Sequence, residues 1–230
     1  MPRATISELF ERNRRHVESL SETYFDDVVD RQQPPVVSLC CSDSRVSQEA
    51  MFDVREPNWL FTPSNIGNVA ADLVAADEVD GSLLYPIRHT DTKTVVVVGH
   101  TGCGAVTAAY DAVRTGDRPT DSSISRRVDA LVPIVEAGLD GPVDGDGEPA
   151  AVIDQLVEYN VRQQTAFLDG HSSLEGEDVT VFGFVYDLHC RYDDVPGATY
   201  LVSIGDETDL DALRAFVPDE YEDGVRSLLA

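Results

Sequence analysis

Residues 95–104 read Val95-Val96-Val97-Val98-Gly99-His100-Thr101-Gly102-Cys103-Gly104. Four consecutive valines are typical of a short buried strand, because β-branched side chains fit a pleated, enclosed surface. The valines run directly into Gly99 and His100, and residues 103–114 continue with the spacing of a helix. The segment therefore predicts a strand, a glycine-rich turn and a helix, with a histidine and a cysteine at the turn.

Similar apolar runs on both sides of this segment predict further strands. Residues 36–40, 58–62 and 179–185 have the composition of core strands, and residues 199–203 that of an edge strand. Helical spacing marks residues 3–31 (one or two helices), 69–88, 122–137, 149–168 and a short tail. Short strands that alternate with helices predict an α/β fold. We expect a central, mostly parallel sheet of about four strands plus the edge strand, flanked by helices, with an N-terminal helical arm.

A second segment, Cys41-Ser42-Asp43-Ser44-Arg45, follows the strand predicted for residues 36–40. In open α/β sheets, ligands bind beyond the carboxyl ends of the strands. If the two strands are neighbours, Cys41 meets His100 and Cys103 at that edge. Two thiolates and an imidazole are zinc ligands, and three protein ligands indicate a catalytic site more than a structural one. A buried thiol pair beside a core histidine is the alternative.

Residues beside the expected ligands also fit a reactive site. Gly102 and Gly104 flank Cys103 at a predicted helix start, where exposed amides favour the thiolate that zinc requires. Asp43 and Arg45 lie two positions apart, so on extended backbone a guanidinium can hold the carboxylate in a bidentate pair. The carboxylate could then orient a hydroxide or ligate the metal itself. An ordinary surface ion pair is the alternative.

The charge balance is extreme. Asp and Glu number 42 against 17 Lys and Arg, the net charge is −25, and Lys93 is the single lysine. Such a surface repels nucleic acid and anionic membranes, so neither is an expected partner. At about 1 M salt the Debye length is about 3 Å, and the internal repulsion is largely screened. The composition therefore predicts a protein of a halophilic organism, an acidic mesophilic protein being the alternative.

The sequence also indicates the compartment. Neither a membrane span nor a signal peptide is apparent, and we expect a soluble, cytoplasmic protein. Disulfides are rare in that compartment, so the four cysteines are expected to be reduced. Adjacent strand residues face opposite sides, which predicts Cys40 in the core and Cys41 at the metal. His189 and Cys190 have the residue types of a metal pair, but a non-ligand interpretation is favoured.

Cys-Ser-Asp-Ser-Arg after one strand, with His-x-x-Cys-Gly after a later one, resembles the β-class carbonic anhydrases over roughly residues 5–205. The resemblance implies one Zn²⁺ per chain, held by Cys41, His100 and Cys103. It implies Asp43 and Arg45 as the catalytic dyad. It further implies a substrate pocket that contains Gln32, Phe61, Ile66, Tyr85 and Gly104.

The activity implied is that of a carbonate dehydratase, a lyase. Carbon dioxide would be hydrated reversibly to bicarbonate and a proton through a zinc-bound hydroxide. In the family some pocket residues come from the partner subunit, so the resemblance implies an obligate homodimer, with a tetramer of dimers as the larger alternative. The whole chain would be one domain, in which residues 1–33 form the dimerisation arm, 34–205 the catalytic core and 206–230 a helical tail.

Two other functions are open on the sequence: hydrolysis of carbon disulfide or carbonyl sulfide on the same scaffold, and a non-catalytic zinc-binding role. Two positions also depart from the family pattern. Ser38 stands where one group of the family has a tryptophan, and Ser64 where the family usually has an arginine. In the family both contribute to an anion-binding regulatory site. Their replacement predicts an ungated enzyme, with water as the fourth zinc ligand.

Overall fold

The four-valine segment lies in the middle of a six-stranded sheet, in a computed structural model that describes residues 2–75 and 77–229. The strand order is β2-β1-β4-β5-β6, and the short β3 also pairs with β1. Pairings among β1 to β5 are parallel, whereas β6 runs antiparallel at the edge. The strands are β1 (Val36–Cys41), β2 (Leu60–Phe61), β3 (Ser64–Asn65), β4 (Thr94–His100), β5 (Thr180–Asp187) and β6 (Ala198–Ile204). The sheet is therefore mostly parallel, as predicted.

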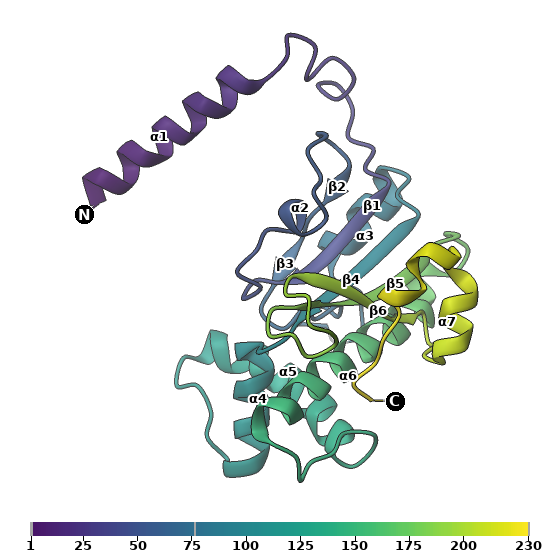
Figure 1. The fold of residues 1–230 in the computed structure, drawn as a ribbon. Coiled ribbons are helices and arrows are strands. Elements are labelled where there is room, and N and C mark those ends of the chain that lie inside the picture. The colour runs from purple at the N-terminus through teal and green to yellow at the C-terminus, as the bar shows by residue number, and fades with distance from the viewer. Residues whose placement is uncertain (1, 76, 230) are drawn as a thin grey trace.

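Helices cover both faces of the sheet, but unequally (Figure 1). The larger core lies on the face that carries Val37, Leu39 and Cys41. Against it pack α3 (Gly81–His89), α4 (Gly104–Thr115), α5 (Ser122–Leu139) and α6 (Pro149–Asp169). The opposite face carries Cys40 and is covered by the short elements α2 (Gln48–Met51), α7 (Leu210–Phe216) and η2 (Asp219–Gly224). A further single turn, η1 (Ser172–Leu174), precedes β5.

Alternation along β1 separates the two adjacent cysteines, as predicted. Cys40 packs with Val96, Val98 and Tyr186, whereas Cys41 belongs to the larger core on the other face. Both side chains are buried, and the cysteines at 40, 41, 103 and 190 are all free thiols. Because successive strand residues point to opposite sides, the two adjacent thiols lie in different cores.

The N-terminal helix α1 (Pro2–Ser19) stands away from the sheet, as Figure 1 shows in purple at the upper left. The prediction of helix across residues 3–31 is wrong for its second part, because residues 20–31 form turns joined by short-range backbone hydrogen bonds. Along α1 and these turns, apolar side chains are exposed, among them Leu9 (58%), Phe10 (71%) and Val29 (72%).

The helix predicted for residues 69–88 is also wrong in its first half. Helix α3 begins only at Gly81, after Asp80, whose carboxylate accepts a hydrogen bond from the Ser82 backbone N–H at 2.8 Å. Before it, the Asn65 side chain bonds both backbone groups of Val69, and Gln164 accepts from the Ala70 N–H. The segment then pairs with itself in an antiparallel manner, because the Asp72 N–H donates to the Glu78 carbonyl and the Asp80 N–H donates to the Ala70 carbonyl. Backbone groups that a helix would have paired internally are satisfied in this way.

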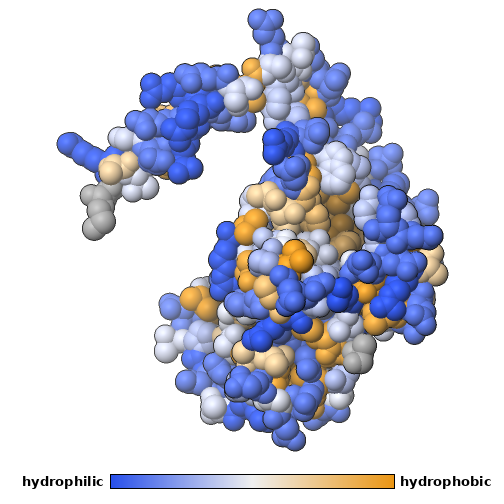
Figure 2. All heavy atoms as spheres, in the orientation of Figure 1, coloured by the Kyte–Doolittle hydropathy of each residue, from blue (hydrophilic) through white to orange (hydrophobic). Residues whose placement is uncertain are grey.

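Hydrophilic residues cover most of the face of the molecule seen in Figure 2. Of the 42 acidic residues, the buried ones within the described part of the chain are Asp154, Glu158 and Asp187. The remaining acids lie fully or partly at the surface, where like charges repel one another. No helix of the described residues is both long and apolar enough to cross a membrane.

Candidate metal centre

Cys41, His100 and Cys103 converge where β1 and β4 end. The two strands pair in parallel, with Cys40 level with Val98, so that Cys41 and His100 leave the sheet side by side. The three potential ligand atoms lie within 4.8 Å of one another, and all three side chains are buried. The sulfur atoms of Cys41 and Cys103 are 3.5 Å apart. The predicted convergence of the three residues is therefore confirmed.

The Cys41 and Cys103 thiols are coupled by a hydrogen bond, and their pKa values shift in opposite directions. The hydrogen bond with Cys103 lowers the pKa of Cys41 to about 4, against the effect of burial, and the backbone amides of Asp43 and Gly67 lower it further. The pKa of Cys103 is raised, first by its bond to Cys41 and then by burial. Either thiol can donate to the other sulfur, so the pair can hold one thiolate, and its negative charge can attract a cation.

His100 completes a donor set that fits zinc. Its Nδ1 atom lies 3.1 Å from the Thr101 carbonyl and 3.2 Å from Arg45 Nη1. A carbonyl oxygen can only accept a hydrogen bond, so the contact with Thr101 calls for a proton on Nδ1. A protonated Nδ1 cannot also accept a hydrogen bond from Arg45. Nε2 then carries the free lone pair, and this buried atom has no hydrogen-bond partner among the residues that the structure describes. Two sulfurs and an unpartnered imidazole nitrogen are the ligands expected of a three-residue zinc site.

Asp43 and Arg45 border this centre, but not in the predicted arrangement. Arg45 Nη1 lies 3.5 Å from Asp43 Oδ2 and donates to the Asp43 backbone carbonyl at 2.9 Å, so the bidentate pair is wrong. The backbone here is a turn, with Arg45 at φ 64°, and not an extended strand. Asp43 Oδ2 instead accepts the Gly104 backbone N–H at 2.9 Å. The carboxylate lies outside the group of three residues that could hold a metal ion.

A cavity of about 420 Å³ adjoins Asp43 and contains two of the predicted pocket residues, Ile66 and Gly104. Its other walls are mostly apolar and come from α4 and α5. The residues that the sequence prediction missed are Ala105, Ala108, Ile124 and Val128. The sequence held part of the information needed to find these residues. Positions 105 and 108 share one face of a predicted helix, and so do positions 124 and 128.

Gln32, Phe61 and Tyr85 are not brought to this cavity within one chain. Gln32 is exposed near the end of the arm, shortly before β1, and Phe61 lies level with Val37 in the sheet. Four strand residues, or about 13 Å, separate that level from Cys41. The Phe61 and Tyr85 rings pack together at 6.1 Å between centroids, and Tyr85 is 51% exposed. The predicted pocket residues thus form two groups on the chain.

The serine positions that depart from the family pattern lie at different distances from the centre: Ser64 is level with Cys40, and Ser38 is level with Val96, further back in the sheet. Ser64 receives a hydrogen bond from Gln48 Nε2 at 3.1 Å, and the same amide donates to the Pro63 carbonyl. The Ser38 hydroxyl is buried in the sheet and finds no hydrogen-bond partner in the described part of the chain. Neither position supplies a positive charge that would hold an anion there.

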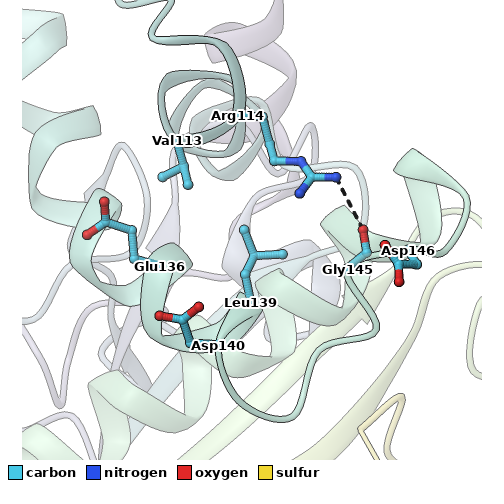
Figure 3. Close-up of a pocket in the computed structure, with 7 residues that line it drawn as sticks. All are labelled: Val113, Arg114, Glu136, Leu139, Asp140, Gly145 and Asp146. Carbon is cyan, nitrogen blue, oxygen red and sulfur yellow. Dashed lines mark hydrogen bonds between the residues drawn. The ribbon is translucent and has the colours of Figure 1, made fainter.

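A separate cavity of about 680 Å³ lies between α4, α5 and the loop that follows α5 (Figure 3). Arg114 crosses one side of it and donates to the Gly145 carbonyl, and Glu136 and Asp140 lie on the α5 side. Neither thiols nor imidazoles line this cavity. It supplies no ligand set comparable to that of Cys41, His100 and Cys103, and we assign no chemistry to it.

Known proteins with similar sequences share this site region. Residues 36–191 match the model of the family described as Carbonic anhydrase. Carbonic anhydrase 2 of Mycobacterium tuberculosis is 30% identical over 162 residues, which cover 68% of this chain and 72% of that protein. A carbonic anhydrase of Pseudomonas aeruginosa is 29% identical over 196 residues, covering 83% and 86% of the two chains.

Solved structures show the same fold. The beta-carbonic anhydrase of Coccomyxa, in complex with acetazolamide, has a TM-score of 0.72 at 24% identity, and 91% of each chain is covered. A structure described as one of two tetrameric beta-carbonic anhydrases from Sordaria macrospora has a TM-score of 0.64 at 19% identity, over 87% of this chain and 95% of the other. The α/β architecture around the metal centre is therefore that of the β-class structures.

Proposed function

The chain belongs to the carbonic anhydrase family and is an enzyme of that family, and we propose that it hydrates carbon dioxide reversibly to bicarbonate and a proton. One observation carries the proposal: three buried potential ligand residues, one fewer than a tetrahedral set, lie together beside a carboxylate and an apolar cavity. Catalytic zinc sites keep such a position for water or substrate, whereas structural sites close it with a fourth protein ligand.

The residues around the centre have separable tasks in this proposal. Zinc held by Cys41, His100 and Cys103 would supply a Lewis acid that makes hydroxide available from water near neutral pH, an effect for which carbonic anhydrases are the standard example. Asp43 is anchored through Oδ2 by the Gly104 N–H, so its orientation is fixed at the mouth of the cavity. A carboxylate there can accept a proton from the nucleophile and orient it. The apolar walls suit an uncharged, linear substrate.

Stopped-flow hydration of carbon dioxide tests the proposal directly. We expect the zinc-loaded protein to accelerate hydration, with a rate that rises between about pH 6 and 9, because the nucleophile is the deprotonated form of water. A chelator-stripped sample should lose this rate and regain it when zinc is restored. The assay should use about 2–3 M potassium chloride, in which surface charge is screened.

The same assay separates the alternative functions. A folded zinc protein that is inactive toward carbon dioxide at every pH would contradict the hydratase. Activity toward carbonyl sulfide or carbon disulfide under those conditions would assign the site to hydrolysis of these gases. Inactivity toward all three gases, with zinc bound, would favour the non-catalytic zinc protein.

Two features of the chain support a homodimer: an exposed apolar N-terminal helix and a set of pocket residues that one chain does not bring together. The apolar side chains of α1, including Leu9 and Phe10, are exposed on a helix that stands away from the sheet. The second group of pocket residues, Phe61 and Tyr85, lies apart from Asp43 within one chain. We propose that residues 1–33 are an arm that binds the second subunit, and that the second subunit supplies Phe61, Tyr85 and Gln32 to the pocket. The tetramers of the Sordaria relatives make a dimer of dimers the larger candidate assembly.

We further propose that the protein is cytoplasmic and adapted to concentrated salt. The salt adaptation is supported by the net charge of −25 and by the placement of nearly all acidic residues at the surface. The free thiols at 40, 41, 103 and 190 agree with a reducing compartment.

Sedimentation velocity and circular dichroism test the assembly and its salt dependence together. In about 2–3 M potassium chloride we expect a folded dimer or a multiple of it, and in about 0.05 M salt we expect loss of the dimer or of the fold, because the unscreened charges repel. A monomer at high salt would contradict the arm. A fully stable dimer in dilute buffer would contradict the salt adaptation.

A further inference from the structure

The three buried carboxylates all bind the segment at Arg191 and Tyr192. Asp187 accepts hydrogen bonds from the backbone N–H groups of His189, Arg191 and Tyr192, and from the Thr101 hydroxyl. Glu158 accepts from the Tyr192 hydroxyl and from the C-terminal segment at Ser227 and Leu228. Burial of a charge is costly unless it is paired and hydrogen-bonded, so this placement calls for a local reason in a chain whose other acids lie at the surface.

Asp154 is the member of this group that contacts the metal loop itself. It lies on α6, which packs against β4 and β5, and is only 2% exposed. Its Oδ1 atom accepts the Gly102 backbone N–H at 2.7 Å, and Oδ2 accepts from Arg191 Nε at 2.7 Å. Burial raises the pKa of Asp154, and the Gly102 amide and Arg191 oppose this effect.

The Gly102 backbone adopts a conformation in which a residue with a Cβ atom would not fit without strain. Its φ of +64° lies in the left-handed region, and a Cβ atom there would be 2.6 Å from Cε1 of His189. The His189 ring is itself fixed by a 2.9 Å contact between Nδ1 and the Thr101 hydroxyl. The Gly102 amide therefore points to Asp154, while the Gly104 amide points to Asp43. Asp154 thus binds the backbone on one side of Cys103, and Asp43 binds it on the other side.

We infer that Asp154, braced by Arg191, is a positioning residue that fixes Gly102 and thereby the Cys103 ligand of the metal centre. The inference rests on the proposed zinc function, because it assigns Asp154 a task only if Cys103 holds a metal. Groups behind the ligands of a metal site commonly change metal affinity about 10- to 100-fold when they are removed. Asp154 acts through the backbone and touches neither metal nor substrate, so the lower end of that range applies.

The test compares variants on the same helix. We expect Asp154→Ala to raise the zinc dissociation constant about 10-fold, measured by competition with a chromophoric chelator. Asp154→Asn, which keeps an acceptor for Gly102 but loses the charge opposite Arg191, should give a smaller increase. In both variants the thiolate-to-cobalt absorption of the cobalt-substituted protein should shift, because the Cys103 sulfur is less tightly placed.

Glu158→Gln is the matched control. Glu158 is equally buried, lies one helical turn further along α6 and pairs with Arg162, but it binds the C-terminal segment and not the metal loop. We expect it to lower the stability of the metal-free protein and to leave zinc affinity and the cobalt spectrum unchanged. Equal loss of zinc affinity in the Glu158 and Asp154 variants would show a merely structural role and overturn the inference. Unchanged affinity in Asp154→Ala would overturn it as well. A wild-type chain that binds no zinc would instead overturn the proposed function and this inference with it.

Discussion

Replacing Cys103 with alanine is expected to abolish stable zinc binding and to lower the rate of carbon dioxide hydration at least about 1,000-fold, since the Lewis acidity of the metal contributes several kcal/mol. The substitution removes one ligand atom and also affects a second ligand, Cys41. The Cys103 thiol is the main cause that lowers the pKa of Cys41, so the remaining cysteine also becomes a weaker thiolate. Metal content by atomic absorption and hydration by stopped flow measure the two effects.

Cys40→Ala provides the control for this prediction. Cys40 is as buried as Cys41 but faces Val96 and Val98 on the other side of the sheet. We expect this variant to keep its zinc and its activity, with a loss of at most about 1–2 kcal/mol in the free energy of unfolding. Normal zinc content in Cys103→Ala, or loss of zinc in Cys40→Ala, would contradict the ligand assignment.

Replacing Asp43 with alanine should separate catalysis from metal binding. We expect the turnover number to fall about 100-fold or more, because proton transfer and orientation by a placed carboxylate contribute on that scale. Zinc should remain bound, because Asp43 lies outside the ligand group. The Gly104 N–H loses its acceptor, but Asp43 is exposed and water can replace it there.

A second aspartate of this chain serves as the matched control. Asp53 and Arg55 repeat the spacing of Asp43 and Arg45 and form an exposed ion pair at 3.1 Å. Asp53→Ala should change turnover by less than about twofold, since exposed pairs contribute little. If Asp43→Ala turned over as fast as wild type, Asp43 would have no catalytic role, and the enzyme would rely on the metal and the cavity alone.

The sequence was most informative where local chemistry and topology agree. Val95–Val98 could be recognised as a buried strand because an unbroken β-branched run has few other uses. The convergence of Cys41 and His100 followed from the rule that parallel strands present their carboxyl ends at one edge. Both predictions required only residue types and strand order, and the structure confirms both.

Predictions failed where distant side chains decide the local backbone. Residues 69–75 have helical spacing, but Gln164 holds the Ala70 N–H from another helix, and the Asp72 N–H and the Ala70 carbonyl pair with Glu78 and Asp80 across a turn. The bidentate pair of Asp43 and Arg45 failed because a left-handed residue turns the chain between strand and helix. Asp154 could not be found either, since an acid on a helix of a strongly acidic chain gives no sign that it faces the interior.

Two of the metal ligands, Cys41 and Cys103, are 62 positions apart in the chain. They meet only after β1 and β4 have paired, so the unfolded chain offers the ion at most the neighbouring pair His100 and Cys103. An ion that binds the native state far better than the unfolded one shifts the folding equilibrium by mass action, by about 1.4 kcal/mol for each tenfold excess over its dissociation constant. Zinc would therefore act as a reversible cross-link between two central strands. The thermal resistance of the enzyme would then follow the supply of the metal.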